Sequence, residues 1–222
     1  MSALVEMKGV VKKFPGVTAL KDISFDIQPG EVHVLLGENG AGKSTLMKIL
    51  SGVYQPTEGT IVIGGKEYSK LTPKDSYENG ISVIYQELSV INELSIQENL
   101  FVGKLPMKKV GIASVVDYAE MNKKAKELLA KIGLKRDPKT FVEDISVSEK
   151  QQVEIAKALA ADSKVIVMDE PTTSLTETEV EHLFKVIRAL KEEGKVIVFI
   201  SHKLEEIKEI GDRVTFLKDG AY

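Results

Sequence analysis

A glycine-rich loop near residue 40 has the residue types and spacing of a phosphate-binding site. Its pattern is G-x-x-x-x-G-K-S with one more glycine inside it, and it reads Gly37-Glu38-Asn39-Gly40-Ala41-Gly42-Lys43-Ser44-Thr45. Glycines let backbone N–H groups close around phosphate oxygens without a clash of Cβ atoms. In such a loop Lys43 reaches the β- and γ-phosphates, and the Ser44 hydroxyl can bind Mg²⁺. The loop therefore predicts a site for Mg²⁺ and a polyphosphate.

The residues on both sides of this loop have the patterns of a strand and a helix. The apolar run 32–36 predicts a buried strand, and residues 45–50, closed by Gly52, predict a helix. A helix that begins at the loop directs the partial positive charge of its N-terminus at the same phosphates. Because the loop lies between an expected strand and an expected helix, we prefer a phosphate site to a glycine-rich turn that binds nothing.

Acidic and imidazole side chains follow two further apolar runs. The run 164–168 is followed by Asp169 and Glu170, and the run 196–200 is followed, after one serine, by His202. Ligands of open parallel sheets lie beyond the carboxyl ends of the strands, so these groups are expected at one edge with the glycine-rich loop. There Asp169 would hold Mg²⁺, Glu170 would orient or deprotonate a water that attacks the γ-phosphorus, and His202 would hydrogen-bond that water or the γ-phosphate. The competing interpretations are an acidic surface turn and a loop histidine without a role.

The remaining patterns predict an α/β fold with a mostly parallel core sheet and antiparallel N-terminal strands. Apolar or alternating runs indicate strands at 4–14, 20–27, 60–63, 81–85 and 213–217. Helical patterns occur at 121–132, from 146–148 to 160, from 176 to 193 and at 203–210. Residues 87–160 carry few strand signals, so we expect a mainly helical subdomain there, inserted into a single domain with its core at 1–86 and 161–222.

The two other histidines are expected to have no role at the phosphate site. His33 lies inside an expected strand and is predicted to be packed or at a sheet edge. His182 lies among charged residues of an expected helix and is predicted to be solvated.

Composition excludes several classes of function. The 222 residues suffice for one domain with a sizeable core, and the net charge of −3 argues against a nucleic-acid partner. There is no cysteine, which excludes disulfides, thiolate metal sites and a cysteine nucleophile. The N-terminus lacks the basic and apolar regions of a signal peptide, and no apolar run approaches the roughly 20 residues that span a bilayer. Association with a membrane is therefore expected to go through a partner.

Five spaced motifs resemble, in their order, those of the ATP-binding subunits of ABC transporters, over the whole chain. They are residues 37–45, 84–88, 146–159, 165–175 and 200–206. The chain looks most like the first nucleotide-binding domain of sugar importers of the ribose, galactose and xylose type, from the residues around 85–87, 153–159 and 174–176. This resemblance implies the P-loop NTPase fold of an ABC ATPase, with ATP and Mg²⁺ at the site.

The resemblance also implies further residue roles. Gln86 would contact Mg²⁺ and water and relay the state of the nucleotide to a membrane permease. Phe14 would stack on adenine, the alternative being a core phenylalanine. Ser146 and Ser148 would belong to the signature segment 146–150, which completes the nucleotide site of a second domain in a head-to-tail dimer.

The partners implied are a second ABC nucleotide-binding domain, fused or in a homodimer, a membrane permease and, indirectly, a periplasmic or extracellular sugar-binding protein, with no nucleic acid. The implied location is the cytoplasmic face of the cell membrane, peripheral through the permease. Family members of this type usually carry two such domains in one chain, whereas this sequence stops at 219–222, just after an expected strand. We therefore expect a fragment that holds the first domain; a natural short chain is the alternative.

The signature segment departs from the usual Leu-Ser-Gly-Gly-Gln of the family, since here it reads Ile145-Ser146-Val147-Ser148-Glu149. Ser148 adds a Cβ where glycine lets backbone approach, and Glu149 adds a carboxylate near phosphate charge. Thr176 stands where many members have an aspartate, although the sugar importers often show threonine. We therefore expect an asymmetric pair of domains, in which this one supplies a working phosphate loop and a poor signature.

Several other classes of protein also carry a phosphate-binding loop of this kind. A GTPase should show Asn-Lys-x-Asp, and the nearest match, 122–125, lacks the aspartate. A small-molecule kinase would leave the segments around Ser146 and His202 unexplained. An ABC ATPase that acts on DNA or ribosomes should show basic surfaces or long coiled-coil insertions, which the sequence lacks. The alternatives that stay open are an ABC ATPase for another substrate, a non-transport ABC ATPase and a catalytically weak, ATP-dependent dimerisation module.

Overall fold

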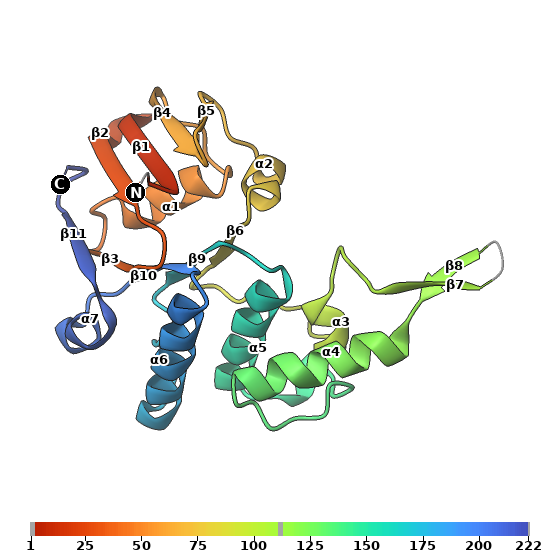
Figure 1. Cartoon of the computed structure of the whole chain (residues 1–222). Coiled ribbons are helices and arrows are strands. Elements are labelled where there is room, and N and C mark those ends of the chain that lie inside the picture. Colours follow the sequence, from red (N-terminus) through yellow and green to blue (C-terminus); the bar gives the residue numbers. More distant parts are fainter. Residues whose placement is uncertain (1–2, 111–112, 222) are drawn as a thin grey trace. The chain divides into compact units, whose positions relative to one another are not determined.

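Figure 1 shows the computed structural model of the chain, which describes residues 3–110 and 113–221. The described residues fall into two compact units. The first unit comprises Met1–Gln86, Ser163–Pro171 and Ile187–Tyr222, and the second comprises Glu87–Asp162 and Thr172–Val186.

The first unit contains a parallel sheet with the strand order β11-β3-β10-β9-β6. Its strands are β3 (Val32–Gly37), β6 (Ile81–Ile84), β9 (Val165–Asp169), β10 (Val196–Ile200) and β11 (Arg213–Leu217). Every residue of β9 and β10 is buried, as expected for central parallel strands that are covered on both faces. The predicted parallel core is therefore confirmed.

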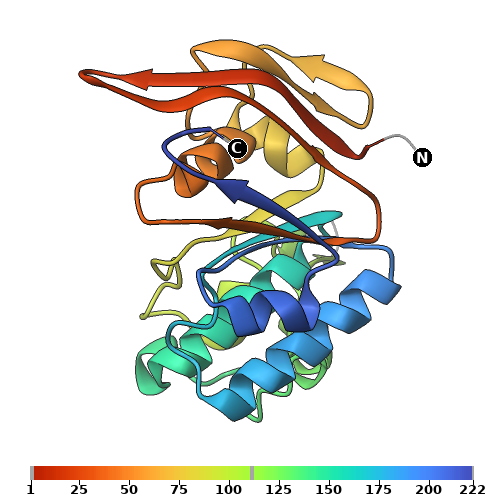
Figure 2. The same ribbon diagram turned by 90° about the vertical axis from the view of Figure 1, so that its left-hand side faces the viewer.

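An antiparallel sheet of the same unit has the order β2-β1-β4-β5. Its strands are β1 (Val5–Phe14), β2 (Val17–Ile27), β4 (Glu58–Ile63) and β5 (Lys66–Tyr68). Helix α1 (Lys43–Leu50) lies between this sheet and the parallel one, and α7 (Leu204–Ile210) lies on the other face of the parallel sheet (Figure 2). The core of the unit joins both sheets to α1, whose Leu46, Met47 and Leu50 are buried. The helix that carries the glycine-rich loop is therefore fixed from two sides.

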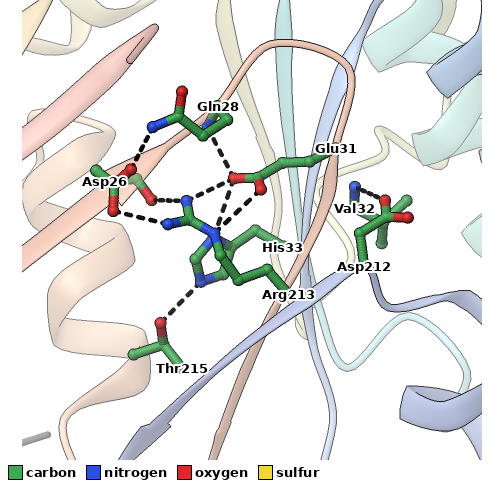
Figure 3. A network of polar contacts seen from close by, with 8 residues as sticks. All are labelled: Asp26, Gln28, Glu31, Val32, His33, Asp212, Arg213 and Thr215. Carbon is green, nitrogen blue, oxygen red and sulfur yellow. Dashed lines mark hydrogen bonds and ion pairs between the residues drawn. The ribbon is translucent and has the colours of Figure 1, made fainter. Parts of the chain in front are cut away.

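A polar network ties the two sheets together away from the glycine-rich loop, near the starts of β3 and β11 (Figure 3). Arg213 of β11 donates to Glu31 Oε1 at 2.8 Å and to Asp26 Oδ1 of β2 at 2.8 Å. His33 Nδ1 lies 3.1 Å from Glu31 Oε1, and its Nε2 lies 2.8 Å from Thr215 Oγ1. Burial lowers the pKa of His33, so the ring is held neutral as a packed strand residue. The expectation for His33 is thus confirmed.

The second unit consists mainly of helices: α3 (Ile96–Leu100), α4 (Tyr118–Lys131), a 3₁₀ turn (Val142–Asp144) and α5 (Val147–Ala160). Helix α6 (Glu177–Glu192) begins in this unit and ends in the first. A hairpin of exposed residues, β7 (Met107–Val110) and β8 (Ala113–Val116), was not predicted from the sequence. The short helix α2 (Pro73–Glu78) belongs to the first unit, and it begins with a capping box. Within the described residues, no helix combines the length and the apolar character needed to cross a membrane.

The prediction that His182 is solvated is wrong. Its Nε2 is buried without a hydrogen-bond partner among the described residues, and a Cβ built on Gly133 would lie 2.4 Å from that atom. Gly133 ends the α4 segment with φ of +73° and leaves the space that the imidazole occupies. The charged neighbours of His182 in the sequence gave no sign of this contact, because it comes from a different helix.

Candidate functional site

The register of the parallel strands places the candidate residues at one edge of the sheet. Ile200 at the end of β10 pairs with Asp169 of β9 on one side and with Leu35 of β3 on the other. Ile84 at the end of β6 pairs with Met168, and the exposed Gln86 follows two residues later. The loops after these strands therefore leave the sheet together at the carboxyl edge, where parallel sheets bind ligands.

The glycines of the loop after β3 stand where a side chain would not fit. A Cβ on Gly37 would lie 2.3 Å from the backbone oxygen of Leu217. Gly42, the N-cap residue of α1, has φ of +104°, and a Cβ there would lie 2.7 Å from Leu20 Cδ2. Both residues are thus required by the close approach of the loop to its neighbours. The resulting backbone leads directly into the N-terminus of α1, which favours bound anions.

Lys43 keeps its ammonium group on the loop itself. The residue is only 6% exposed, and its Nζ donates to the backbone oxygens of Gly37 at 2.6 Å and of Glu38 at 3.0 Å. A buried ammonium group whose hydrogen bonds go to loop carbonyls can turn to phosphate oxygens, which are charged and stronger acceptors. The geometry therefore suits a cation that binds the terminal phosphates of a nucleotide.

Two oxygen donors suited to Mg²⁺ lie together beside the loop. The Ser44 hydroxyl donates to Asp169 Oδ2 at 3.2 Å, and Asp169 is only 8% exposed. Burial raises the pKa of Asp169, and the hydrogen bond from Ser44 opposes this shift only in part. A hydroxyl and a buried carboxylate at this distance fit a hard cation that takes its other ligands from phosphate and water. A bound dication would also relieve the cost of burying the carboxylate charge.

Glu170 and His202 meet at the same edge of the sheet. His202 Nδ1 lies 3.2 Å from Glu170 Oε1, and the backbone N–H of Glu170 donates to Ile200 O at 3.1 Å. Glu170 has φ of +48°, a left-handed conformation that is uncommon for a residue with a side chain and occurs often at functional sites. The buried Ser201 Oγ donates to Glu206 Oε2 at 2.7 Å and so fixes the loop that carries His202. The structure therefore brings together the two residues that the sequence proposes as a water-orienting pair.

Phe14 ends β1 in an aromatic and cationic cluster. The ring of Tyr54 packs edge-on against Phe14 with centroids 5.4 Å apart, and Lys12 Nζ lies 5.0 Å from the centroid of Phe14. Phe14 is only half-buried, so it is not a phenylalanine of the hydrophobic core, which was the alternative to adenine stacking. Sequence reasoning missed Tyr54 and Lys12, because their positions beside Phe14 depend on the tertiary fold.

The signature segment lies in the second unit, where it begins helix α5. Ser146 caps this helix: its Oγ accepts from the backbone N–H of Glu149 at 3.2 Å. Ser146 Oγ and Ser148 Oγ lie 3.1 Å apart. Arg136, which sequence reasoning did not single out, forms an ion pair with Glu149. The helix therefore begins where the pattern at 146–148 predicts, and its capping box was not predicted from the sequence.

A glycine-rich loop with a buried lysine, a hydroxyl–carboxylate pair and a Glu–His pair at the carboxyl edge of a parallel sheet defines the P-loop NTPase class. Within that class, the family model described as "ABC transporter" matches residues 20–173. The chain therefore belongs to the ABC transporter family.

Curated relatives at about half identity carry the names of sugar import proteins. The "Galactose/methyl galactoside import ATP-binding protein MglA" of Clostridium tetani (strain Massachusetts / E88) is 51% identical over 99% of this chain and 44% of its own length. The "D-allose import ATP-binding protein AlsA" of Escherichia coli (strain K12) is 51% identical over 98% of this chain and 42% of its own length. The chain thus spans less than half the length of these relatives.

Solved structures of ATP-binding cassettes have the same fold. One is the dimeric structure of a post-hydrolysis state of MJ0796 bound to ADP and Pi, with a TM-score of 0.84, 28% identity and coverage of 98% of this chain and 95% of that chain. Another is the ADP conformation of MJ1267, with a TM-score of 0.85, 25% identity and coverage of 100% and 89%. These likenesses confirm the ABC ATPase form of the P-loop fold.

Proposed function

We propose that this chain binds and hydrolyses ATP and thereby powers the import of a monosaccharide through a membrane permease. The observation that carries the proposal is the joint placement of the Ser44–Asp169 and Glu170–His202 pairs at the edge of the sheet that holds the glycine-rich loop. The names of the relatives, which are import ATP-binding proteins for galactose, allose and ribose, support the transport part.

Each residue has a role that its contacts favour. The loop 37–45 cradles the phosphates through its backbone N–H groups, and Lys43 exchanges its carbonyl partners for β- and γ-phosphate oxygens. Ser44 and Asp169 would hold Mg²⁺, with Gln86 as a third ligand; the ion neutralises phosphate charge when bound. Glu170 accepts a proton from, or orients, the attacking water, and His202 holds Glu170 in place or donates to the γ-phosphate. Phe14 stacks on the adenine ring.

The proposed partners follow from the relatives and from the dimeric cassette. A second ABC domain, fused or a second copy of the chain, would meet this one head to tail, and Ser146 and Ser148 would contact its nucleotide. A permease would hold the pair at the cytoplasmic face of the membrane, and a sugar-binding protein would act through that permease. The MJ0796 cassette forms a dimer in a post-hydrolysis state bound to ADP and Pi, which supports the dimeric part.

The test is Mg-ATP turnover per mole of chain, measured against protein concentration with Glu170→Gln beside the unchanged chain. We expect turnover that rises with concentration, because the complete site needs two domains, and loss of turnover with retained ATP binding in Glu170→Gln. Binding without turnover at any concentration would contradict hydrolysis by this chain alone. A folded sample that binds no Mg-ATP would refute the assignment of the phosphate loop itself.

A further inference from the structure

The carboxylate of Glu149 is the most unfavourable feature of the signature segment. If the segment receives a triphosphate, as the proposed function requires, a free carboxylate there would repel it. In the structure this side chain turns back to its own helix start, where Glu149 Oε2 accepts from the backbone N–H of Ser146 at 2.9 Å. One of its oxygens is therefore already engaged in capping α5.

Arg136 engages the same carboxylate through two donors. Its Nε lies 2.6 Å from Glu149 Oε1 and its terminal nitrogen lies 3.2 Å from Oε2, a paired arrangement that fixes the planes of both groups. The side chain of Glu149 is 17% exposed and that of Arg136 is 44% exposed, so the carboxylate is the more enclosed partner. The hydrogen bond from Arg136 is the main cause that holds the pKa of Glu149 below its usual value. The charge of Glu149 is thus fully formed and locally balanced.

Ser148, which replaces the second glycine of the usual signature, also has partners. Its Oγ lies 3.1 Å from Ser146 Oγ, and after the backbone N–H of Thr176 it also helps to hold the pKa of Glu179, in the first turn of α6, below its usual value. Glu179 Oε2 in turn accepts from the backbone N–H and the hydroxyl of Thr176, each at 2.8 Å. Ser148 and Glu149, which replace the second Gly and the Gln of the usual signature, therefore both have partners within the second unit.

We propose that Arg136 is a positioning residue of the signature segment, which pairs with Glu149 so that the start of α5 can accept the γ-phosphate of ATP bound to a second copy of this chain. This inference rests on the proposed function and revises the expectation of a poor signature. Without Arg136, the unpaired carboxylate would add a negative charge beside the incoming triphosphate. With it, the segment carries no net charge at that position, and the N–H groups of α5 add their partial positive charge.

The test measures ATP-driven self-association of the Glu170→Gln chain, in which hydrolysis is blocked, by sedimentation at low salt. In that background Arg136→Gln should weaken association about five- to tenfold, since it exposes the phosphate to an uncompensated charge. Glu149→Gln alone leaves the guanidinium unpaired and should not weaken association, and the double variant should regain the starting value. The defect should shrink at high salt, as expected for partly exposed charges. Fold stability, measured by thermal melting, should not show the same loss in Arg136→Gln and the same recovery in the double variant.

Arg188→Gln is the matched control, because Arg188 forms a comparable ion pair with Glu209 elsewhere, at 2.9 Å with side chains 47% and 48% exposed. It should leave association unchanged. Association that is insensitive to Arg136→Gln, or not regained in the double variant, would overturn the proposed role of Arg136. Absence of ATP-driven association, with Mg-ATP binding retained, would overturn the inference and leave the nucleotide site standing. Absence of Mg-ATP binding in a folded sample would remove the proposed function and the inference together.

Discussion

Gly42→Ala tests whether the phosphate loop needs glycine for close packing as well as for backbone freedom. Alanine at φ of +104° costs about 1–2 kcal/mol of conformational free energy. Its Cβ would also lie 2.7 Å from Leu20 Cδ2 and 2.8 Å from Ala19 O, and overpacking of this kind costs about 1–3 kcal/mol. The expected loss in the free energy of unfolding is therefore about 2–5 kcal/mol. Displacement of the helix start should also weaken Mg-ATP binding.

Gly40→Ala is the matched control within the same loop. Gly40 has φ of +84°, but a Cβ there meets no atom within 4 Å, so only the conformational cost of about 1–2 kcal/mol applies. The assay is urea denaturation of both variants, with Mg-ATP affinity measured by calorimetry on the folded fraction. Equal losses of stability in the two variants would refute the argument that contact with Leu20 and Ala19 makes glycine necessary at position 42.

Three further perturbations have expected outcomes. Lys43→Ala should weaken Mg-ATP binding about tenfold or more, by calorimetry, since it removes a charged donor to phosphate. Asp169→Asn should raise the free energy of unfolding without Mg²⁺ by about 0.5–2 kcal/mol at pH 8. Burial raises the pKa of the Asp169 carboxyl, so its ionisation opposes folding as the pH rises through that pKa. The gain in stability should therefore fade in acid, where the carboxyl is protonated. Arg213→Met should cost about 2–4 kcal/mol in urea denaturation, because it leaves Glu31 enclosed without its guanidinium partner; a loss below 1 kcal/mol would show that the network does not hold the sheets together.

The parts of the fold that could be predicted are those whose signals are local. Runs of buried apolar residues indicate β9 and β10 without any tertiary information, because central parallel strands are apolar on both faces. The capping box at 176–179 likewise locates the start of α6 within one residue, since cap and helix are adjacent in sequence. The meeting of Ser44 with Asp169 also follows from the sequence, given parallel strands that share one edge.

The features that escaped prediction depend on contacts between distant segments or on weak patterns. The hairpin β7–β8 has exposed residues throughout most of its length, so no alternation of apolar and polar residues indicates its strands. The five-residue helix α3 is too short to show a helical period. His182 is enclosed by a glycine from another helix, which nothing in its own sequence neighbourhood indicates.

The charge balance of the signature segment depends on a residue that lies outside the segment. Glu149, considered by itself, adds a negative charge to a segment proposed to meet phosphate, and the sequence alone therefore favours a defective site. Arg136 lies 13 positions earlier, too far to be read as an i,i+4 partner, yet its guanidinium meets both oxygens of that carboxylate. The relevant charge at this helix start is that of the pair, which is zero. A departure from the usual signature can thus keep the electrostatic requirement of the segment while changing its residues, and the proposed double variant of Arg136 and Glu149 measures whether it does.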